Sequence, residues 1–172
     1  MWCRPLQDHH PKHCKRQWWS SVVPVSQLLL DREINDAMFF FCPRLAKIKR
    51  HVDEHYDEPF TLAQAAEIAA LEKTYFCKVF RAKVGISFVD WLARERVKRA
   101  LLMLMDHDHR ITDLAFAVGF GDLRTFERAF KKCVGLTPRQ CKSIVRQHSA
   151  TGSTASQLRW EEIAPTLHDA VL

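Results

Sequence analysis

The sequence predicts an all-α protein in which two helix-turn-helix subdomains are joined by a long linker helix. Between residues 43 and 148, glycine occurs only at 85, 119, 121 and 135, and proline only at 43, 59 and 138. Glycine and proline interrupt helices, and their spacing here is typical of a succession of helices. A second observation is an internal repeat, because residues 61–87 align without a gap on residues 111–137 at an offset of fifty. A third is that lysine and arginine recur at matched positions of both copies.

Length and composition exclude several classes of protein. The chain has 172 residues, 47% hydrophobic and 27% charged, which is enough for a buried core and argues against intrinsic disorder. No apolar run approaches the roughly 18 residues that span a bilayer, and the amino terminus lacks the apolar stretch of a secretory signal. The six cysteines are scattered without a CxxC pair, which favours free thiols in a reducing compartment. We therefore expect a cytoplasmic protein with no membrane segment.

The net charge of +6 belongs to the middle of the chain. Residues 43–148 hold 20 basic and 13 acidic side chains, whereas residues 1–42 hold five and four, and residues 149–172 hold one and three. A basic domain favours a polyanionic partner. The expected domains are a segment 1–42, poorly ordered or with one helix around Gln27–Phe41, a double helix-turn-helix domain 43–148, and a flexible tail 149–172. Within the domain, the subdomains cover about 43–86 and 107–148.

The first subdomain is expected to begin with a helix over Arg44–Tyr56, because Pro43 suits a first helical turn. Its apolar face consists of Leu45, Ile48 and Val52. Thr61 and Gln64 then form a capping-box pattern, which predicts a second helix from Thr61 through about Ala69.

The linker helix is expected over about residues 87–106, starting at the Ser87–Asp90 capping pattern. Its charged residues Arg94, Glu95, Lys98 and Arg99 lie off a single apolar stripe. That stripe consists of Phe88, Trp91, Leu92, Val97, Ala100, Leu101 and Leu104. Thr137-Pro138 predicts the start of a last helix.

Each copy of the repeat has the anatomy of a helix-turn-helix. A short helix carries a small residue (Ala65, Ala115) where a second helix crosses closely, and a small residue follows at the turn (Ala69, Gly119). The second helix has phenylalanines four residues apart that point to the core. These pairs are Phe76 with Phe80 and Phe126 with Phe130, and Gly85 and Gly135 are the expected C-caps.

The opposite face of each second helix is basic. It carries Lys73, Lys78 and Arg81 in the first copy and Arg124, Arg128, Lys131 and Lys132 in the second. Such a helix fits the major groove of DNA, where arginine can read guanine through two hydrogen bonds. A linker helix of about twenty residues is roughly 30 Å long, close to the roughly 34 Å between successive major grooves on one face of the duplex. The two second helices of the repeat could therefore enter two adjacent major grooves.

Residues 43–147 resemble the DNA-binding region of AraC/XylS-type transcriptional regulators. The most specific segment runs from Ile111 to Pro138 and reads ITDLAFAVGFGDLRTFERAFKKCVGLTP. It is similar to the family pattern I-x-x-(I/L)-A-x-x-x-G-F followed by F-x-x-x-F-K-K-x-x-G-x-(S/T)-P. The resemblance implies a bacterial protein with two helix-turn-helix subdomains that binds promoter DNA and alters polymerase recruitment.

The resemblance also implies a set of DNA-contacting residues. The first reading helix corresponds to Lys73–Lys83, and the second to Asp122–Lys132. In the first reading helix, the residues that would face DNA are Lys73, Thr74, Cys77, Lys78 and Arg81. In the second reading helix, the residues that would lie at bases are Leu123, Arg124, Glu127 and Arg128. Those that would lie near phosphates are Lys131 and Lys132. Thr61, at the amino terminus of a helix, corresponds to a position that would contact a backbone phosphate.

Several residues depart from the family pattern. Glu72 stands where serine is common and would repel phosphate. Cys77 and Leu123 are poor hydrogen-bonding readers, so specificity would rest mainly on Lys78, Arg124 and Arg128. Cys141-Lys142 replaces an aromatic–arginine pair, which keeps a charge and loses the arginine fork. Only 42 residues precede the domain, as in minimal or truncated members, and Met38 is an alternative start.

Three other patterns suggest different chemistry. His51 and His55 match an HxxEH zinc-peptidase pattern, but a peptidase needs a third ligand and a cleft, so we expect a solvated helix face. The amino-terminal group Cys3, His9, His10, His13 and Cys14 could hold zinc by residue type, although a plain tail is expected. Cys77 could act as a redox switch, and a structural thiol is the simpler interpretation. No metal, cofactor or catalytic residue is predicted.

The expected function is sequence-specific binding of double-stranded promoter DNA by a transcription regulator that is not an enzyme. A monomer can occupy DNA because the duplication supplies two reading helices, and RNA polymerase is a further expected partner. The alternative is a degenerate regulator, spoiled for operator reading by Leu123 and Glu72, that acts as a protein-interaction module on polymerase or another regulator.

Overall fold

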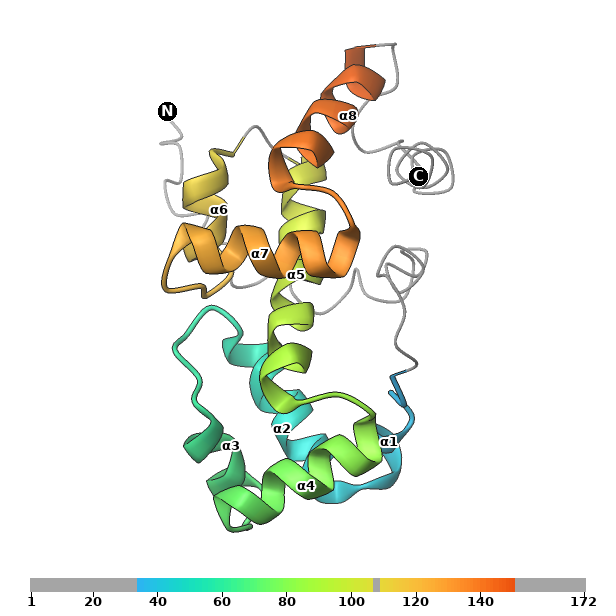
Figure 1. The fold of residues 1–172 in the computed structure, drawn as a ribbon, viewed down its shortest axis with the longest axis vertical. Helices are drawn as coiled ribbons and strands as arrows, with labels where there is room; N and C mark the ends of the chain where they lie inside the picture. The colour runs from blue at the N-terminus through green and yellow to red at the C-terminus, as the bar shows by residue number, and fades with distance from the viewer. Residues whose placement is uncertain (1–33, 107–108, 151–172) are drawn as a thin grey trace, which may run out of the picture.

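The computed structural model describes residues 34–106 and 109–150, and all regular elements in these two ranges are helices (Figure 1). They are α1 (Met38–Phe41), α2 (Pro43–His55), α3 (Leu62–Ile68), α4 (Lys73–Val84), α5 (Phe88–Asp106), α6 (Ile111–Ala117), α7 (Leu123–Val134) and α8 (Pro138–Ala150). The predicted fold class is confirmed: two helix-turn-helix subdomains are joined by the long α5. None of the helices in the described part of the chain is long and apolar enough to cross a membrane.

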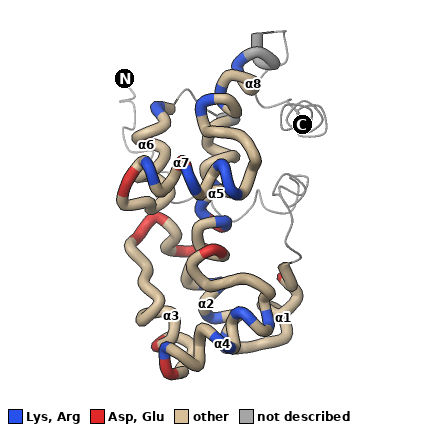
Figure 2. Tube along the Cα trace, viewed as in Figure 1, with Lys and Arg blue, Asp and Glu red and all other residues tan. Residues whose placement is uncertain are grey.

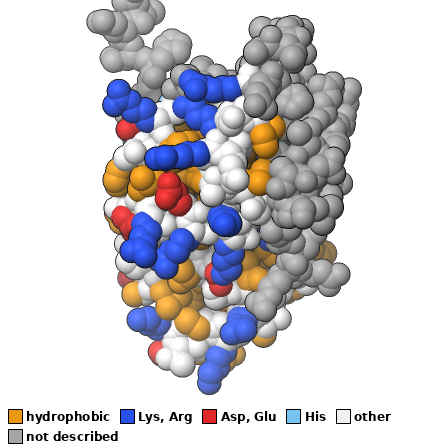
Figure 3. Space-filling view, turned by 45° about the horizontal axis from the view of Figure 1, so that its top comes forward, with side chains coloured by type: hydrophobic (Ala, Val, Ile, Leu, Met, Phe, Trp, Pro, Cys, Tyr) orange, Lys and Arg blue, Asp and Glu red, His pale blue; other side chains and the backbone are white. Residues whose placement is uncertain are grey.

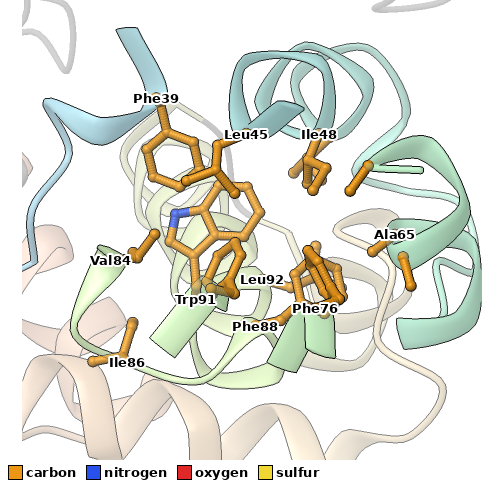
Figure 4. Close-up of a cluster of buried hydrophobic side chains, with 14 residues drawn as sticks. Phe39, Leu45, Ile48, Ala65, Phe76, Val84, Ile86, Phe88, Trp91 and Leu92 are labelled. Atoms are coloured by element: carbon orange, nitrogen blue, oxygen red, sulfur yellow. The ribbon is translucent and has the colours of Figure 1, made fainter. Parts of the chain in front are cut away.

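The first core lies between α1, α2, α3, α4 and the start of α5 (Figure 4). The predicted face of α2, Leu45, Ile48 and Val52, is buried there. Phe76 and Phe80 of α4 are fully buried as predicted, with ring centroids 5.5 Å apart.

The packed unit extends ahead of the predicted boundary at Pro43. Phe39 of α1 is 5% exposed, and its ring stacks on Trp91 at a centroid distance of 4.9 Å. Burying an aromatic ring against another stabilises the unit, so residues 38–42 belong to the first subdomain. The earlier part of the predicted helix over Gln27–Phe41 lies outside the described residues.

The linker α5 contributes to two separate cores. Its first half supplies Phe88, Trp91 and Leu92 to the first core. Its second half supplies Val97, Ala100, Leu101 and Leu104 to the second. The whole predicted apolar stripe is therefore buried, and the Ser87 hydroxyl accepts the predicted capping bond from the Asp90 amide. At about 1.5 Å per residue, the 19 residues of α5 extend about 28 Å.

The second core repeats the first with α6, α7 and α8. Phe126 and Phe130 of α7 are fully buried, and Cys141 of α8 is buried with them. Burial raises the pKa of the Cys141 thiol to about 12, so this residue fills core space as a neutral side chain.

The predicted caps are present at the ends of both second helices and at α3. Thr61 and Gln64 form the full capping box at the start of α3. Gly85 and Gly135 end α4 and α7 with φ of 92° and 84°, the left-handed region that favours glycine.

The gapless alignment of the two copies is wrong in their first helices. Thr61 and Arg110 are the residues that precede α3 and α6, and the buried residues Ala65, Ala66 and Ala69 correspond to Leu114, Ala115 and Val118. The offset is therefore 49 in these helices and fifty in α4 and α7. The second turn is one residue longer, and Ala70 (φ 51°), not Ala69, is the counterpart of Gly119 (φ 87°).

Two charged residues off the apolar stripe of α5 are buried rather than solvated. Glu95 is 2% and Arg99 6% exposed. Glu95 pairs with Lys98 at 2.7 Å, and Arg99 pairs with Asp53 of α2 at 2.9 Å. Glu95 also lies 3.6 Å from Lys49 of α2. Periodicity alone did not reveal the pairs between α5 and α2, because these helices lie far apart in the sequence.

Candidate nucleic-acid interface

Of the two basic helices, α7 runs across the long α5, and α4 lies beyond the start of α5 toward the opposite end of the molecule (Figure 1). Lysine and arginine positions recur along both helices (Figure 2). On the face seen in Figure 3, basic side chains are spread from one end of the molecule to the other, with few acidic ones between them. Each helix reaches this arrangement because its phenylalanines anchor the opposite face in a core.

On α4, most of the predicted DNA-contacting residues are exposed. These are Lys73, Thr74, Lys78 and Arg81, whereas Cys77 is half-buried. Tyr75, which the sequence did not single out, is 58% exposed near the start of the same helix. The first turn of a recognition helix is where base edges are usually contacted, and an exposed aromatic residue next to Thr74 was the signal that could have found it.

Glu72 has a local structural role that its charge alone did not suggest. It is the N-cap of α4, and its carboxylate accepts a hydrogen bond from the Tyr75 amide at 2.9 Å. Hydrogen bonds from the backbone amides of Thr74 and Tyr75 hold the Glu72 pKa below its usual value. Asp122 does the same for α7, accepting from the Thr125 amide at 2.7 Å, so an acidic N-cap is common to both copies.

On α7, the basic side chains Arg124, Arg128, Lys131 and Lys132 are all exposed. Arg124, Arg128 and Lys131 line an open hollow with Glu127, Thr137 and Arg139. Arg139, at the start of α8, was missed by the sequence analysis because it lies outside the repeat. Its position beside α7 adds a further cation to this hollow.

Two predicted contact residues of α7 are engaged within the protein. Leu123 is half-buried and packs against the second core. Lys132 forms an ion pair with Asp90 in the first turn of α5. Thr61 is exposed, and its hydroxyl accepts from the Gln64 amide in the capping box.

Lys142 and Cys77, which depart from the family pattern, are both partly buried. Lys142, on the first turns of α8, donates a hydrogen bond to the His109 carbonyl. Cys77 and Cys133 are free, half-buried thiols, and burial raises the pKa of Cys133.

The HxxEH pattern shows no third ligand beside it. The rings of His51 and His55 lie 5.0 Å apart, His51 packs on Phe60, and His55 Nδ1 lies 3.3 Å from Glu58. Within residues 34–106 and 109–150, no group of three histidine, cysteine, aspartate or glutamate side chains could hold a metal ion. The amino-terminal group of Cys3, His9, His10, His13 and Cys14 lies outside the described residues.

Comparison with known proteins gives the same architecture. A family model described as a helix-turn-helix domain matches residues 65–143. The arabinose operon regulatory protein of Salmonella typhimurium is 30% identical over 114 residues, which are 66% of this chain and 37% of that protein. The corresponding protein of Escherichia coli is 30% identical over 58% of this chain and 35% of its own length. The chain thus matches about a third of the length of these relatives.

Solved structures extend the comparison. The C-terminal domain of the two-component response regulator yesN from Fusobacterium nucleatum is 32% identical, with a TM-score of 0.52, over 55% of this chain and 93% of that one. The DNA-binding domain of AdpA, solved in complex with a target DNA, shares the fold at a TM-score of 0.58 and 24% identity, over 64% of this chain and 98% of that one.

A duplicated helix-turn-helix with two exposed basic second helices defines the class of DNA-binding domains of transcription regulators. Within that class, this chain belongs to the AraC/XylS-type family through its DNA-binding region. Both arabinose operon proteins are regulatory proteins by name.

Proposed function

We propose that this protein binds double-stranded promoter DNA sequence-specifically by inserting α4 and α7 into two adjacent major grooves. The observation that carries the proposal is the recurrence of exposed cations on the outer face of both second helices, each anchored by a buried phenylalanine pair. With α5 about 28 Å long by its rise per residue, the two helices suit successive grooves roughly 34 Å apart. One monomer would then cover both half-sites.

The proposed roles follow from the chemistry of each side chain. Arg124 and Arg128 would read bases, because a guanidinium donates two parallel hydrogen bonds to guanine. Lys131 and the missed Arg139 would neutralise phosphates as charges beside the groove. The remaining proposed contacts are Thr61, Lys73, Thr74, Cys77, Lys78, Arg81, Leu123, Glu127 and Lys132.

The comparisons and the charge distribution support this function over the alternative of a protein-interaction module. One reason for the alternative was the charge of Glu72, and that carboxylate serves as a helix cap. The other reason was Leu123, and beside it α7 still exposes Arg124, Arg128 and Lys131. The solved AdpA domain in complex with DNA supports the use of this fold on a duplex. Contact with RNA polymerase would follow from binding at promoters.

Footprinting on a site selected from random DNA tests the proposal. We expect a protected stretch of about twenty base pairs, two helical turns, at one protein per site. If about six to eight phosphates are contacted, the logarithm of the binding constant should fall with the logarithm of salt concentration with a slope near −5 to −7. A flat salt response, or no preference for any sequence, would contradict the function, and binding only to another protein would favour the alternative.

A further inference from the structure

Three segments from different parts of the chain meet at one point between the two subdomains. They are the end of α2 with the residues after it, the middle of α5, and the turn between α6 and α7. Arg96 of α5 joins the first two: its Nε donates to the Tyr56 carbonyl at 2.9 Å, and its Nη2 donates to the Glu58 carbonyl at 2.8 Å. The guanidinium therefore holds the end of the first subdomain's α2 against the linker.

The turn of the second subdomain packs on the same point. A Cβ atom added to Gly119 would lie 2.5 Å from the Tyr56 carbonyl oxygen and 3.0 Å from Arg96 Nε. The Arg96 guanidinium also lies 5.8 Å from the centre of the Phe120 ring, within reach of a cation–π attraction. Arg96 thus contacts both subdomains at once.

Neighbouring residues reinforce this contact. The Arg99 guanidinium lies 4.3 Å over the ring of Tyr56, and Arg99 also pairs with Asp53 of α2. Arg99 therefore ties both the Tyr56 ring and the end of α2 to α5, close to the carbonyl that accepts from Arg96. We call Tyr56, Glu58, Arg96, Gly119 and Phe120 the joint.

The joint lies beside the turn that leads into α7, so its geometry affects the orientation of α7. The turn that contains Gly119 leads directly to the N-cap Asp122 and the first residue of α7, Leu123. A rotation of this turn relative to α2 would therefore rotate one basic helix relative to the other. One base pair more or less between half-sites turns the second groove by about 35° and shifts it by about 3.4 Å on a duplex of 10–10.5 base pairs per turn, so a rigid joint would reject both changes.

We propose that Arg96 is a positioning residue that fixes the orientation of α7 relative to α4 and thereby sets the half-site separation that the protein accepts. This role rests on the proposed function, because it requires both helices to occupy DNA together. Arg96 itself contacts no DNA in this scheme. It acts on spacing and leaves the base preference of each half-site unchanged.

The test uses the full chain and a bipartite site selected with the wild-type protein. Dissociation constants are measured on the selected site and on versions with one or two base pairs inserted or deleted between the half-sites. For the wild type we expect about a tenfold or greater loss at one inserted or deleted pair. For Arg96→Ala we expect less than about a threefold loss, at weaker affinity for the original site, with the same preferred bases in each half.

Two further variants separate the joint from charge and from misfolding. Arg96→Lys keeps the charge but lacks the planar fork that reaches two carbonyls, so its spacing profile should also flatten. Lys47→Ala removes a charge from an exposed position of α2 and should weaken all spacings alike. Should Arg96→Ala fail to fold, as judged by circular dichroism, the profile of Arg96→Lys decides.

The outcomes distinguish the role from the function on which it depends. A wild type that selects no bipartite site would overturn the proposed function and the role with it. A wild type with a steep spacing profile that Arg96→Ala and Arg96→Lys both retain would overturn the positioning role alone.

Discussion

Arg124 and Lys131 lie on one exposed face of α7, but their side chains suit different parts of the duplex. Arg124 lies in the first turn of α7, where a recognition helix usually contacts base edges, and Lys131 lies in the last turn, where we propose a phosphate contact. Arg124→Ala is expected to cost about 1–3 kcal/mol at one base position and to relax the choice of base there. Lys131→Ala should weaken all sequences similarly and reduce the salt slope by about one. Titrations on single-position variants of the selected site, at several salt concentrations, measure both.

Lys132 is the matched comparison for Lys131 because it is a neighbouring lysine with a different environment. Its ammonium is paired with Asp90, so a nearby negative charge offsets part of its attraction for phosphate. We expect Lys132→Ala to change the salt slope less than Lys131→Ala. Equal losses on random and selected DNA for Arg124→Ala would refute its role as a reader.

At this scale the sequence predicted exposure well and partners poorly. The cations at 78, 124, 128 and 131 are exposed, because helical spacing opposite a buried phenylalanine pair determines which way they point. Helical periodicity does not reveal the cap function of Glu72, the packing of Leu123 on the second core, or the approach of Arg139. Those depend on turn geometry and on contacts between elements.

Among the elements, the helices and their caps were predictable, and the turns between them were not. The capping boxes and the C-terminal glycines have local signatures within three or four residues. The extra residue in the turn between α6 and α7 has no such local signature, because a gapless alignment also matches the alanines at 65 and 115. Burial resolves the register: Ala66 and Ala115 are the equivalent core positions.

The turn before α7 gives a prediction at the same scale. Gly119 has φ 87°, and an added Cβ would meet the Tyr56 carbonyl oxygen at 2.5 Å, whereas nothing lies within 4 Å of a Cβ at Gly121. Gly119→Ala combines left-handed strain of about 1–3 kcal/mol with this steric conflict, so we expect a loss of unfolding free energy of at least about 2 kcal/mol. Urea unfolding followed by circular dichroism measures it.

Gly121→Ala is the control for that substitution, since it adds the same methyl group two residues away. Its unfolding free energy should stay within about 0.5–1 kcal/mol of the wild type, the range of a glycine-to-alanine change at a compatible position. Similar losses for the two variants would show that the approach of Gly119 to Tyr56 contributes little.

For the whole molecule, the sequence predicted two units and a shared helix but not how the units are fixed to each other. The apolar stripe of α5 divides between the cores after Leu92, with Val97 beginning the second share. Between these two shares lie Glu95 and Arg96, which connect α5 to α2 and to the second turn. Because they are polar residues, hydrophobic periodicity assigned them no partner. The boundary at Pro43 missed Phe39 because its packing on Trp91 joins elements that lie far apart in the sequence.

Glu95 provides a test of how strongly this region stabilises the fold. It is 2% exposed, and although burial raises its pKa, the charges of Lys98, Lys49 and Arg99 outweigh that effect and hold the pKa below its usual value. Glu95→Gln keeps the shape and removes the charge that these cations share. Removing one partner of a buried ion pair typically costs about 3–5 kcal/mol, and we expect the lower end at pH 7, because Arg99 keeps Asp53.

The pH dependence gives the sign of that effect. A carboxylate with a lowered folded-state pKa stabilises the protein above its unfolded-state pKa of about 4.3, and this stabilisation is lost as the pH falls through the folded-state pKa. The difference in unfolding free energy between wild type and Glu95→Gln should therefore be full at pH 7 and shrink below about pH 4.3. Urea unfolding across this range measures it, with Glu67→Gln at an exposed position of α3 as a control expected to change little at pH 7. A difference that stays constant down to pH 3 would mean that the charge of Glu95 does not couple α5 to α2.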